Sequence, residues 1–134
     1  MNEEAVKLWI QKADDDLRAA KMLVNTGDPI TWIVCFHAQQ AAEKYLKAFV
    51  IFHGQEHPRT HNILVLVHQC AQIEKSFSEM KEWGIRVLTR YAIALRYGEE
   101  VYIPDVEETQ KAIKLAEQVQ AFVREKLAQK GLKL

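Results

Sequence analysis

The chain has 134 residues, and its 18 Lys and Arg side chains balance 18 Asp and Glu, so its formal net charge is zero. This length predicts one domain over residues 1–134, and the apolar fraction of 49% is typical of a globular protein. The balanced charge argues against a protein that coats DNA through an overall basic surface, although it leaves room for a local basic site.

The positions of the cysteines and the lengths of the apolar runs exclude further classes of protein. Cys35 and Cys70 lie far apart and form no C-x-x-C motif, which excludes a zinc ribbon or a thioredoxin-like site. The first residues are acidic and lack the apolar core of a signal peptide, and the longest apolar stretch, residues 48–52, is far too short to span a bilayer. We therefore predict a cytoplasmic protein with no membrane partner.

Helical periodicity dominates the first half of the chain. Apolar residues recur every three or four positions from residue 3 to about 25, which predicts a helix that Gly27 and Pro29 end. A second helix is predicted from Pro29, with Asp28 as its N-cap, to about His53. Its apolar side chains lie nearly all round, which is typical of a helix at the centre of its domain or buried by a partner subunit.

Three more helices are predicted in the second half. A short one begins at 60–62, a fourth runs from residue 78 to about 97 with Gly84 inside it, and the last runs from 105 to 131. No run alternates long enough to form a sheet. We therefore predict an all-α fold, an antiparallel up-and-down four-helix bundle with one additional short helix in the connection between its second and third helices.

Four segments, taken in chain order, resemble a known family. They are residues 13–20 (ADDDLRAA), 36–48 (FHAQQAAEKYLKA), 58–63 (PRTHNI) and 95–98 (LRYG). The run QAAEK-x-x-KA, followed by Thr-His, is the most specific of them. Together they resemble the HEPN domain family, and the resemblance covers nearly the whole chain.

The resemblance implies a helical bundle that commonly dimerises and often works with a separate minimal nucleotidyltransferase in a toxin–antitoxin-type system. It also implies an association with nucleotides or RNA, and some members are metal-independent ribonucleases that use an Arg followed after four to six residues by a His. No arginine here has a His at that spacing: His61 follows Arg59 too closely, and the segment where the motif would fall reads Arg90-x5-Arg96-Tyr97. This departure favours a binding module over an enzyme.

One face of the second helix carries candidate binding residues. His37, Gln40, Lys44 and Lys47 share it at helical spacing, and two ammonium groups with an amide suit a phosphate or a nucleotide. The alternative is a solvated polar face. Glu43 lies about 100° from Lys44 around the helix, so it is a poor partner for that lysine.

The other candidates are Arg90, Arg96 and Tyr97 on the fourth helix, and His61. A guanidinium and an aromatic ring suit a nucleotide, whereas an arginine at a helix end also stabilises the helix dipole. For His61 the alternative is a ring bonded to the backbone or to a nearby carboxylate.

Histidines and carboxylates also recur in ways that suggest metal ligands. His53, His57 and His61 repeat every four residues, as zinc ligands on a helix do, but Gly54 and Pro58 break that helix. The consecutive carboxylates at 14–16 fan over about 200° and cannot converge on Mg²⁺.

We therefore predict no metal site and no cofactor. We interpret residues 14–16 as a solvated face, with Asp16 as the one carboxylate that can turn inward and pair with a Lys or Arg.

These observations support one leading hypothesis and two alternatives. The leading one is a homodimeric helical module that holds a nucleotide or a nucleic-acid end, or is modified by its nucleotidyltransferase partner. The alternatives are a ribonuclease with a degenerate motif, built from Arg90 or Arg96 with His61, and a purely structural helical subunit.

Overall fold

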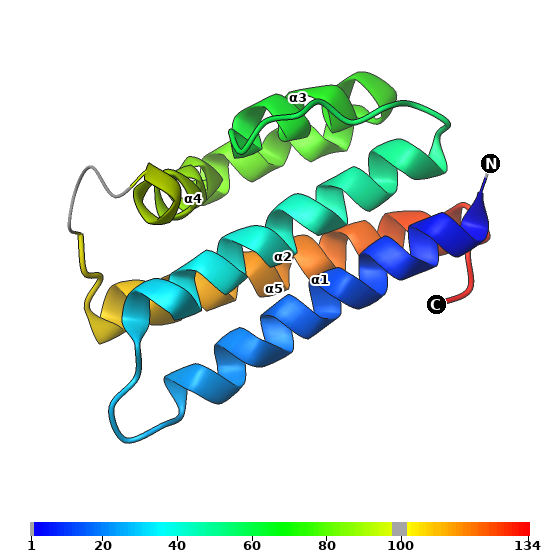
Figure 1. Cartoon of the computed structure of the whole chain (residues 1–134). Helices are drawn as coiled ribbons and strands as arrows, with labels where there is room; N and C mark the ends of the chain where they lie inside the picture. Colours follow the sequence, from blue (N-terminus) through cyan, green and yellow to red (C-terminus); the bar gives the residue numbers. More distant parts are fainter. Residues whose placement is uncertain (1, 98–101) are drawn as a thin grey trace.

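The structure is a computed structural model that describes residues 2–97 and 102–134, with side chains described for 2–92 and 102–134. Regular structure in these ranges is helical throughout (Figure 1), which confirms the all-α class. The α-helices are α1 (Glu3–Val24), α2 (Thr31–Phe52), α3 (Ile63–Ile73), α4 (Leu88–Tyr97) and α5 (Val106–Gln129). Two 3₁₀ helices, η1 (Lys75–Trp83) and η2 (Ile85–Val87), connect α3 to α4.

Capping residues set several helix limits where the sequence predicts them. The side chains of Asn2, Asn62 and Asp105 each accept a backbone N–H from the first turn of the helix that follows, at 2.7–3.1 Å. Gly131, with φ of 93°, closes the end of α5.

The predicted start of α2 is wrong by two residues. The first backbone bonds of the helix, from the N–H groups of Ile33 and Val34, are accepted by the Ile30 carbonyl at 3.1 Å. Asp28 and Pro29 therefore stay in the connection, and no side chain caps this end of the helix.

The predicted fourth helix is also shorter than expected. Residues 75–87 form 3₁₀ turns, and the α-helix begins only at Leu88. The cause is Gly84, whose φ of 76° is left-handed and cannot continue a right-handed helix. This break divides the segment into η1 and η2.

The central helix of the fold is α2. It packs against α1 and α5 on one side and against α3 and α4 on the other (Figure 1). In the same view α1 runs opposite to both α2 and α5. The all-round apolarity of α2 is therefore satisfied within one chain, so it does not by itself indicate a partner subunit.

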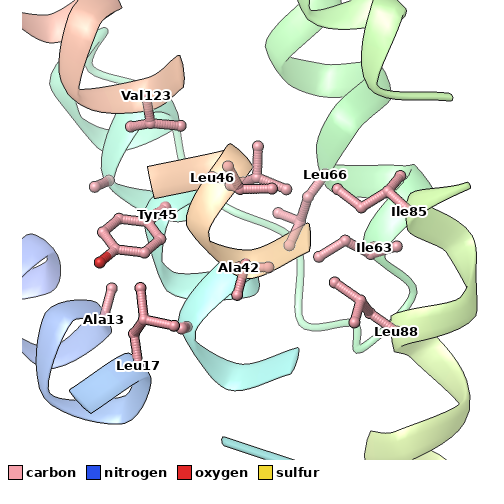
Figure 2. Close-up of a cluster of buried hydrophobic side chains, with 14 of the residues drawn as sticks. Ala13, Leu17, Ala42, Tyr45, Leu46, Ile63, Leu66, Ile85, Leu88 and Val123 are labelled. Atoms are coloured by element: carbon pink, nitrogen blue, oxygen red, sulfur yellow. The ribbon is translucent and has the colours of Figure 1, made fainter. Parts of the chain in front are cut away.

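Buried side chains on both sides of α2 form one continuous core. Figure 2 shows Tyr45 near Ala13 and Leu17 of α1, whereas Leu46 lies toward Leu66 of α3. All five side chains are at most 2% exposed. This core holds the helices that carry the polar groups described next.

The two cysteines belong to the core as free thiols. Burial raises the pKa of Cys35 to about 11 and that of Cys70 to about 12. Both thiols stay protonated near neutral pH and are therefore unreactive. Across the described residues, no helix has both the length and the apolarity that a membrane crossing requires.

Candidate functional site

Asp16 of α1 lies at the centre of the first polar network. Its carboxylate accepts a hydrogen bond from Lys44 Nζ at 2.5 Å and lies 2.8 Å from His37 Nδ1. The Asp16 side chain is only 13% exposed, so the predicted inward pairing of Asp16 with a Lys is confirmed. These contacts turn the side chains of His37 and Lys44, which share one face of α2, toward α1.

Glu43 of α2 is the centre of the second network and is almost fully buried, at 1% exposure. Its carboxylate lies 2.9 Å from Lys47 Nζ and 3.3 Å from His61 Nδ1, and it accepts the amides of Gln39 at 2.8 Å and Gln40 at 3.2 Å. Burial raises the pKa of Glu43, but the hydrogen bonds from Lys47 and Gln39 outweigh burial and hold its pKa below the ordinary value.

A third network, which the sequence did not indicate, surrounds Asp14. Its carboxylate accepts hydrogen bonds from Arg124, from the Tyr45 hydroxyl and, at 3.0 Å, from Gln120 Nε2. Burial, reinforced by the Asp14 charge, raises the pKa of Tyr45. The interpretation of 14–16 as a solvated face therefore holds for Asp15, which is exposed, but is wrong for Asp14.

Five of the predicted site residues thus lie in adjacent networks on the side of α2 that meets α1 and the loop before α3. Carboxylates of the chain itself already neutralise the two lysines among them. An anionic ligand would have to compete with Asp16 and Glu43 for those ammonium groups. The five residues are His37, Gln40, Lys44, Lys47 and His61.

The three histidines that repeat every four residues in the sequence have different partners in the structure. The His53 ring lies 4.6 Å from the Phe49 ring, and the His57 ring meets Trp9 edge-on at 5.4 Å. His61 contacts the Glu43 carboxylate, as its local alternative predicts. Among the described residues, no three His, Cys, Asp or Glu side chains gather as a metal site does.

Arg90 lies apart from these networks, in a surface hollow of about 820 Å³. Among the described residues of the lining, three side chains are cations and none is a carboxylate. The lining residues are Asn62, Leu64, Lys81, Gly84, Arg86, Val87, Thr89 and Arg90. The sequence indicated only Arg90, because Lys81 and Arg86 reach the same hollow through the left-handed break at Gly84.

Two contacts fix the walls of this hollow. Thr89 Oγ1 accepts the backbone N–H of Ile63 at 3.0 Å, which ties the start of α4 to the start of α3. The Arg90 guanidinium lies 5.3 Å from the centre of the Tyr102 ring, a cation–π contact that positions its charge.

Lys81, Arg86 and Arg90 are exposed at this hollow, and no ion pair joins any of the three to another described side chain. Such a group of unneutralised cations attracts an anion. The side chains of Arg96 and Tyr97 lie outside the described residues, so their predicted part in a binding site stays a prediction.

The helical bundle and its polar networks define a small all-α domain of a known type. The family model of the HEPN domain matches residues 6–126, and the chain belongs to this family. A crystal structure of TT1696 from Thermus thermophilus is similar, with 28% identity and a TM-score of 0.73 over 90% of this chain and 97% of that one. The chain matches no curated protein sequence.

The crystal structure of ST0689, an archaeal HEPN homologue, is also similar. It has 24% identity and a TM-score of 0.68 over 90% of this chain and 96% of that one. At this identity the likeness concerns the fold alone.

Proposed function

We propose that this HEPN domain is a binding module for a phosphate-bearing ligand, a nucleotide or a nucleic acid. The observation that supports the proposal is the hollow at Lys81, Arg86 and Arg90, whose described lining residues include three cations and no carboxylate. A guanidinium group can donate two parallel hydrogen bonds to two oxygens of one phosphate. The Asn62 amide and the Thr89 hydroxyl add neutral hydrogen-bonding groups.

The volume of the hollow suits such a ligand. About 820 Å³ falls within the range of small-molecule sites. The Lys44 face is a weaker candidate, because each of its lysines already has a carboxylate partner. We place the primary contacts at Arg86 and Arg90, and keep the contribution of Lys44 and Lys47 as a prediction, which the same experiment tests at Lys44.

Calorimetry with ATP and with a short RNA tests the proposal. Arg86→Ala and Arg90→Ala should each weaken binding by about 1–3 kcal/mol, as expected for hydrogen bonds to charged groups. Lys44→Ala shows whether the Lys44 face of α2 contributes to binding besides the hollow. The matched control is Arg18→Ala, which removes an exposed arginine of α1. Absence of heat with both ligands at millimolar concentration would leave a purely structural subunit as the better description, whereas equal affinities in all variants would remove these residues from the binding site.

We further propose that the domain works with a separate minimal nucleotidyltransferase, as the family resemblance implies. The test is the neighbouring reading frame: co-expression of a short nucleotidyltransferase encoded there should yield a stable complex on gel filtration. Two separate peaks at micromolar concentration would contradict the partnership.

The alternative is a ribonuclease that uses Arg90 or Arg96 with His61. His61 directly precedes Asn62, which lines the basic hollow, but its ring is engaged by Glu43. We expect no cleavage, because the Arg-x(4–6)-His pair is absent from the sequence and a 2′-hydroxyl needs a positioned base. RNA that is cut in the presence of a chelator, with cutting lost in His61→Ala, would establish the enzyme instead.

Two further proposals concern the oligomeric state of the domain and its location in the cell. We propose a homodimer, because α2 and α5 begin at the same end of the bundle (Figure 1) and exposed apolar side chains lie at or just before both helix starts: Ile30, Trp32, Ile103 and Val106. We also propose a cytoplasmic location, since both cysteines are free thiols, as is usual in a reducing compartment.

A further inference from the structure

A second hollow adjoins the basic hollow described above. It measures about 340 Å³ and is lined by Trp83, Gly84, Val87, Lys111, Lys114, Leu115 and Gln118. Gly84 and Val87 line both hollows. The two are therefore neighbours on one face, separated by the segment that joins η1 to α4, and the second reaches onto α5.

Positive charge continues across this face. The second hollow adds Lys111 and Lys114 to the three cations of the first, and in the part of the chain that the structure describes no carboxylate lines either hollow. Among the described residues, the only ion pair of these five cations joins Lys111 to Glu107 at 3.5 Å, with both side chains more than 70% exposed. A pair so exposed contributes little, so the positive charge of these cations remains available to a polyanion.

At the boundary between the two hollows, Gly84 has no side chain and the aromatic ring of Trp83 lies next to it in the sequence. Gly84 is exposed and has open space where a side chain would stand, so an extended ligand can cross there. Trp83 is half-buried and meets Phe122 edge-on at 5.8 Å. This packing holds an indole ring in the second hollow, where a nucleic-acid base can stack on it.

We propose that a single-stranded nucleic acid spans both hollows, with its phosphates at the five cations and one base stacked on Trp83. This inference rests on the proposed function and names its ligand. A mononucleotide occupies only the first hollow and does not reach Lys111 and Lys114. A duplex keeps its bases paired and stacked inside the helix, so none is available to Trp83.

Fluorescence anisotropy with a labelled eight-nucleotide RNA, in competition with ATP and with a blunt-ended duplex that has no loop, tests the inference. The decisive variant is Lys111→Ala/Lys114→Ala, and the matched control is Lys7→Ala/Arg18→Ala, two exposed cations of α1 that line neither hollow. The strand should bind more tightly than ATP or the duplex. The decisive variant should weaken strand binding on the order of tenfold, lower the salt slope by about two, and leave ATP affinity unchanged.

Each other outcome has a definite meaning. A strand that binds the decisive variant as well as wild type, or no tighter than ATP, overturns the two-hollow site but leaves the proposed function intact, since Arg86→Ala and Arg90→Ala still report on the first hollow. Tighter binding of the duplex also overturns it. If neither strand nor ATP binds wild type, the inference and the proposed function both fall.

Tryptophan emission tests the stacking separately. In a Trp9→Phe/Trp32→Phe background, Trp83 is the only remaining tryptophan. Saturating strand should quench its emission, and Trp83→Phe should retain more strand affinity than Trp83→Leu, because stacking requires an aromatic face. Unchanged emission with bound strand would remove the stacked base from the site.

Discussion

At the residue scale, the most consequential group is Glu43, a charged carboxylate in the middle of the central helix. Its burial is balanced by Lys47, His61 and two amides. A buried charge with its partners in place is tolerated, whereas removing one partner leaves the other uncompensated and destabilises the fold. Glu43 also ties the loop that carries His61 to α2, so its charge state affects the loop as well as the helix.

Acid should weaken the fold through Glu43. Because the pKa of Glu43 in the folded chain lies below its ordinary value of 4.5, its contribution to the free energy of unfolding is fully present above about pH 4.5 and is lost as the pH falls through the folded pKa. Urea unfolding of wild type and Glu43→Gln should therefore show a stability difference at pH 7 that narrows toward pH 3.

The size of this effect and its control follow from burial. At pH 7 the loss in Glu43→Gln should be about 3 kcal/mol, the lower end of the range for a broken buried ion pair. Glu79→Gln, at an exposed position on η1, should change stability by less than about 0.5 kcal/mol. A difference between wild type and Glu43→Gln that stays constant from pH 7 to pH 3 would contradict this assignment.

At the scale of elements, the segment between α3 and α4 determines the candidate site. A continuous α-helix from Ser78 would have presented its residues at 100° intervals around one axis. The left-handed Gly84 instead separates η1 from η2 and brings Lys81 to the same hollow as Arg86 and Arg90. The site therefore depends on a helix break rather than on a helix face.

Gly84→Ala should destabilise the protein by about 1 kcal/mol, because an L side chain is strained at a φ of 76°. The replacement meets no neighbour, so strain alone accounts for the effect. Gly27→Ala is the matched control: it too meets open space, its φ is not positive, and it should be neutral or slightly stabilising. Denaturant midpoints for the two variants that coincide would show that residue 84 is not strained.

At the scale of the whole molecule, the property to be predicted is the oligomeric state. The apolar surface of α2 is covered by α1, α3, α4 and α5 of the same chain, so it no longer supports a dimer. The proposed dimer depends instead on the exposed apolar side chains where α2 and α5 begin, an end of the bundle where the Cys35 thiol lies 3.6 Å from Thr109 Oγ1. Exposed apolar groups gathered in one place are typical of an interface.

Light scattering at micromolar concentration should therefore give twice the 15.5 kDa mass of one chain. Trp32→Glu/Val106→Glu should shift the mass to that of a monomer while the helical circular dichroism stays unchanged, because both side chains are exposed and an apolar interface does not accept charge. Leu8→Glu, also exposed but on α1, should remain dimeric. A wild-type mass of 15.5 kDa would contradict the homodimer.

The sequence by itself determined the properties that depend on residues a few positions apart. Helical periodicity indicated the all-α class and helix starts at 60–62 and at 105, and the structure places the N-caps of α3 and α5 there, at Asn62 and Asp105. The order of short segments along the chain is likewise a property of the sequence, and the family match confirms the resemblance. Local signals of this kind act within one or two helical turns, so they can be recognised before the chain folds.

Only the tertiary structure decided which charges meet. Asp14 pairs with Arg124 and Asp16 with Lys44 across helix interfaces, and Lys81 lines the same hollow as Arg90 across the break at Gly84. No spacing in the sequence indicates such contacts, because they depend on how α1, α2 and α5 pack and on a backbone angle that departs from the helix. The same packing covered the apolar surface of α2 beyond its first turn, since one chain supplies neighbours on both of its sides.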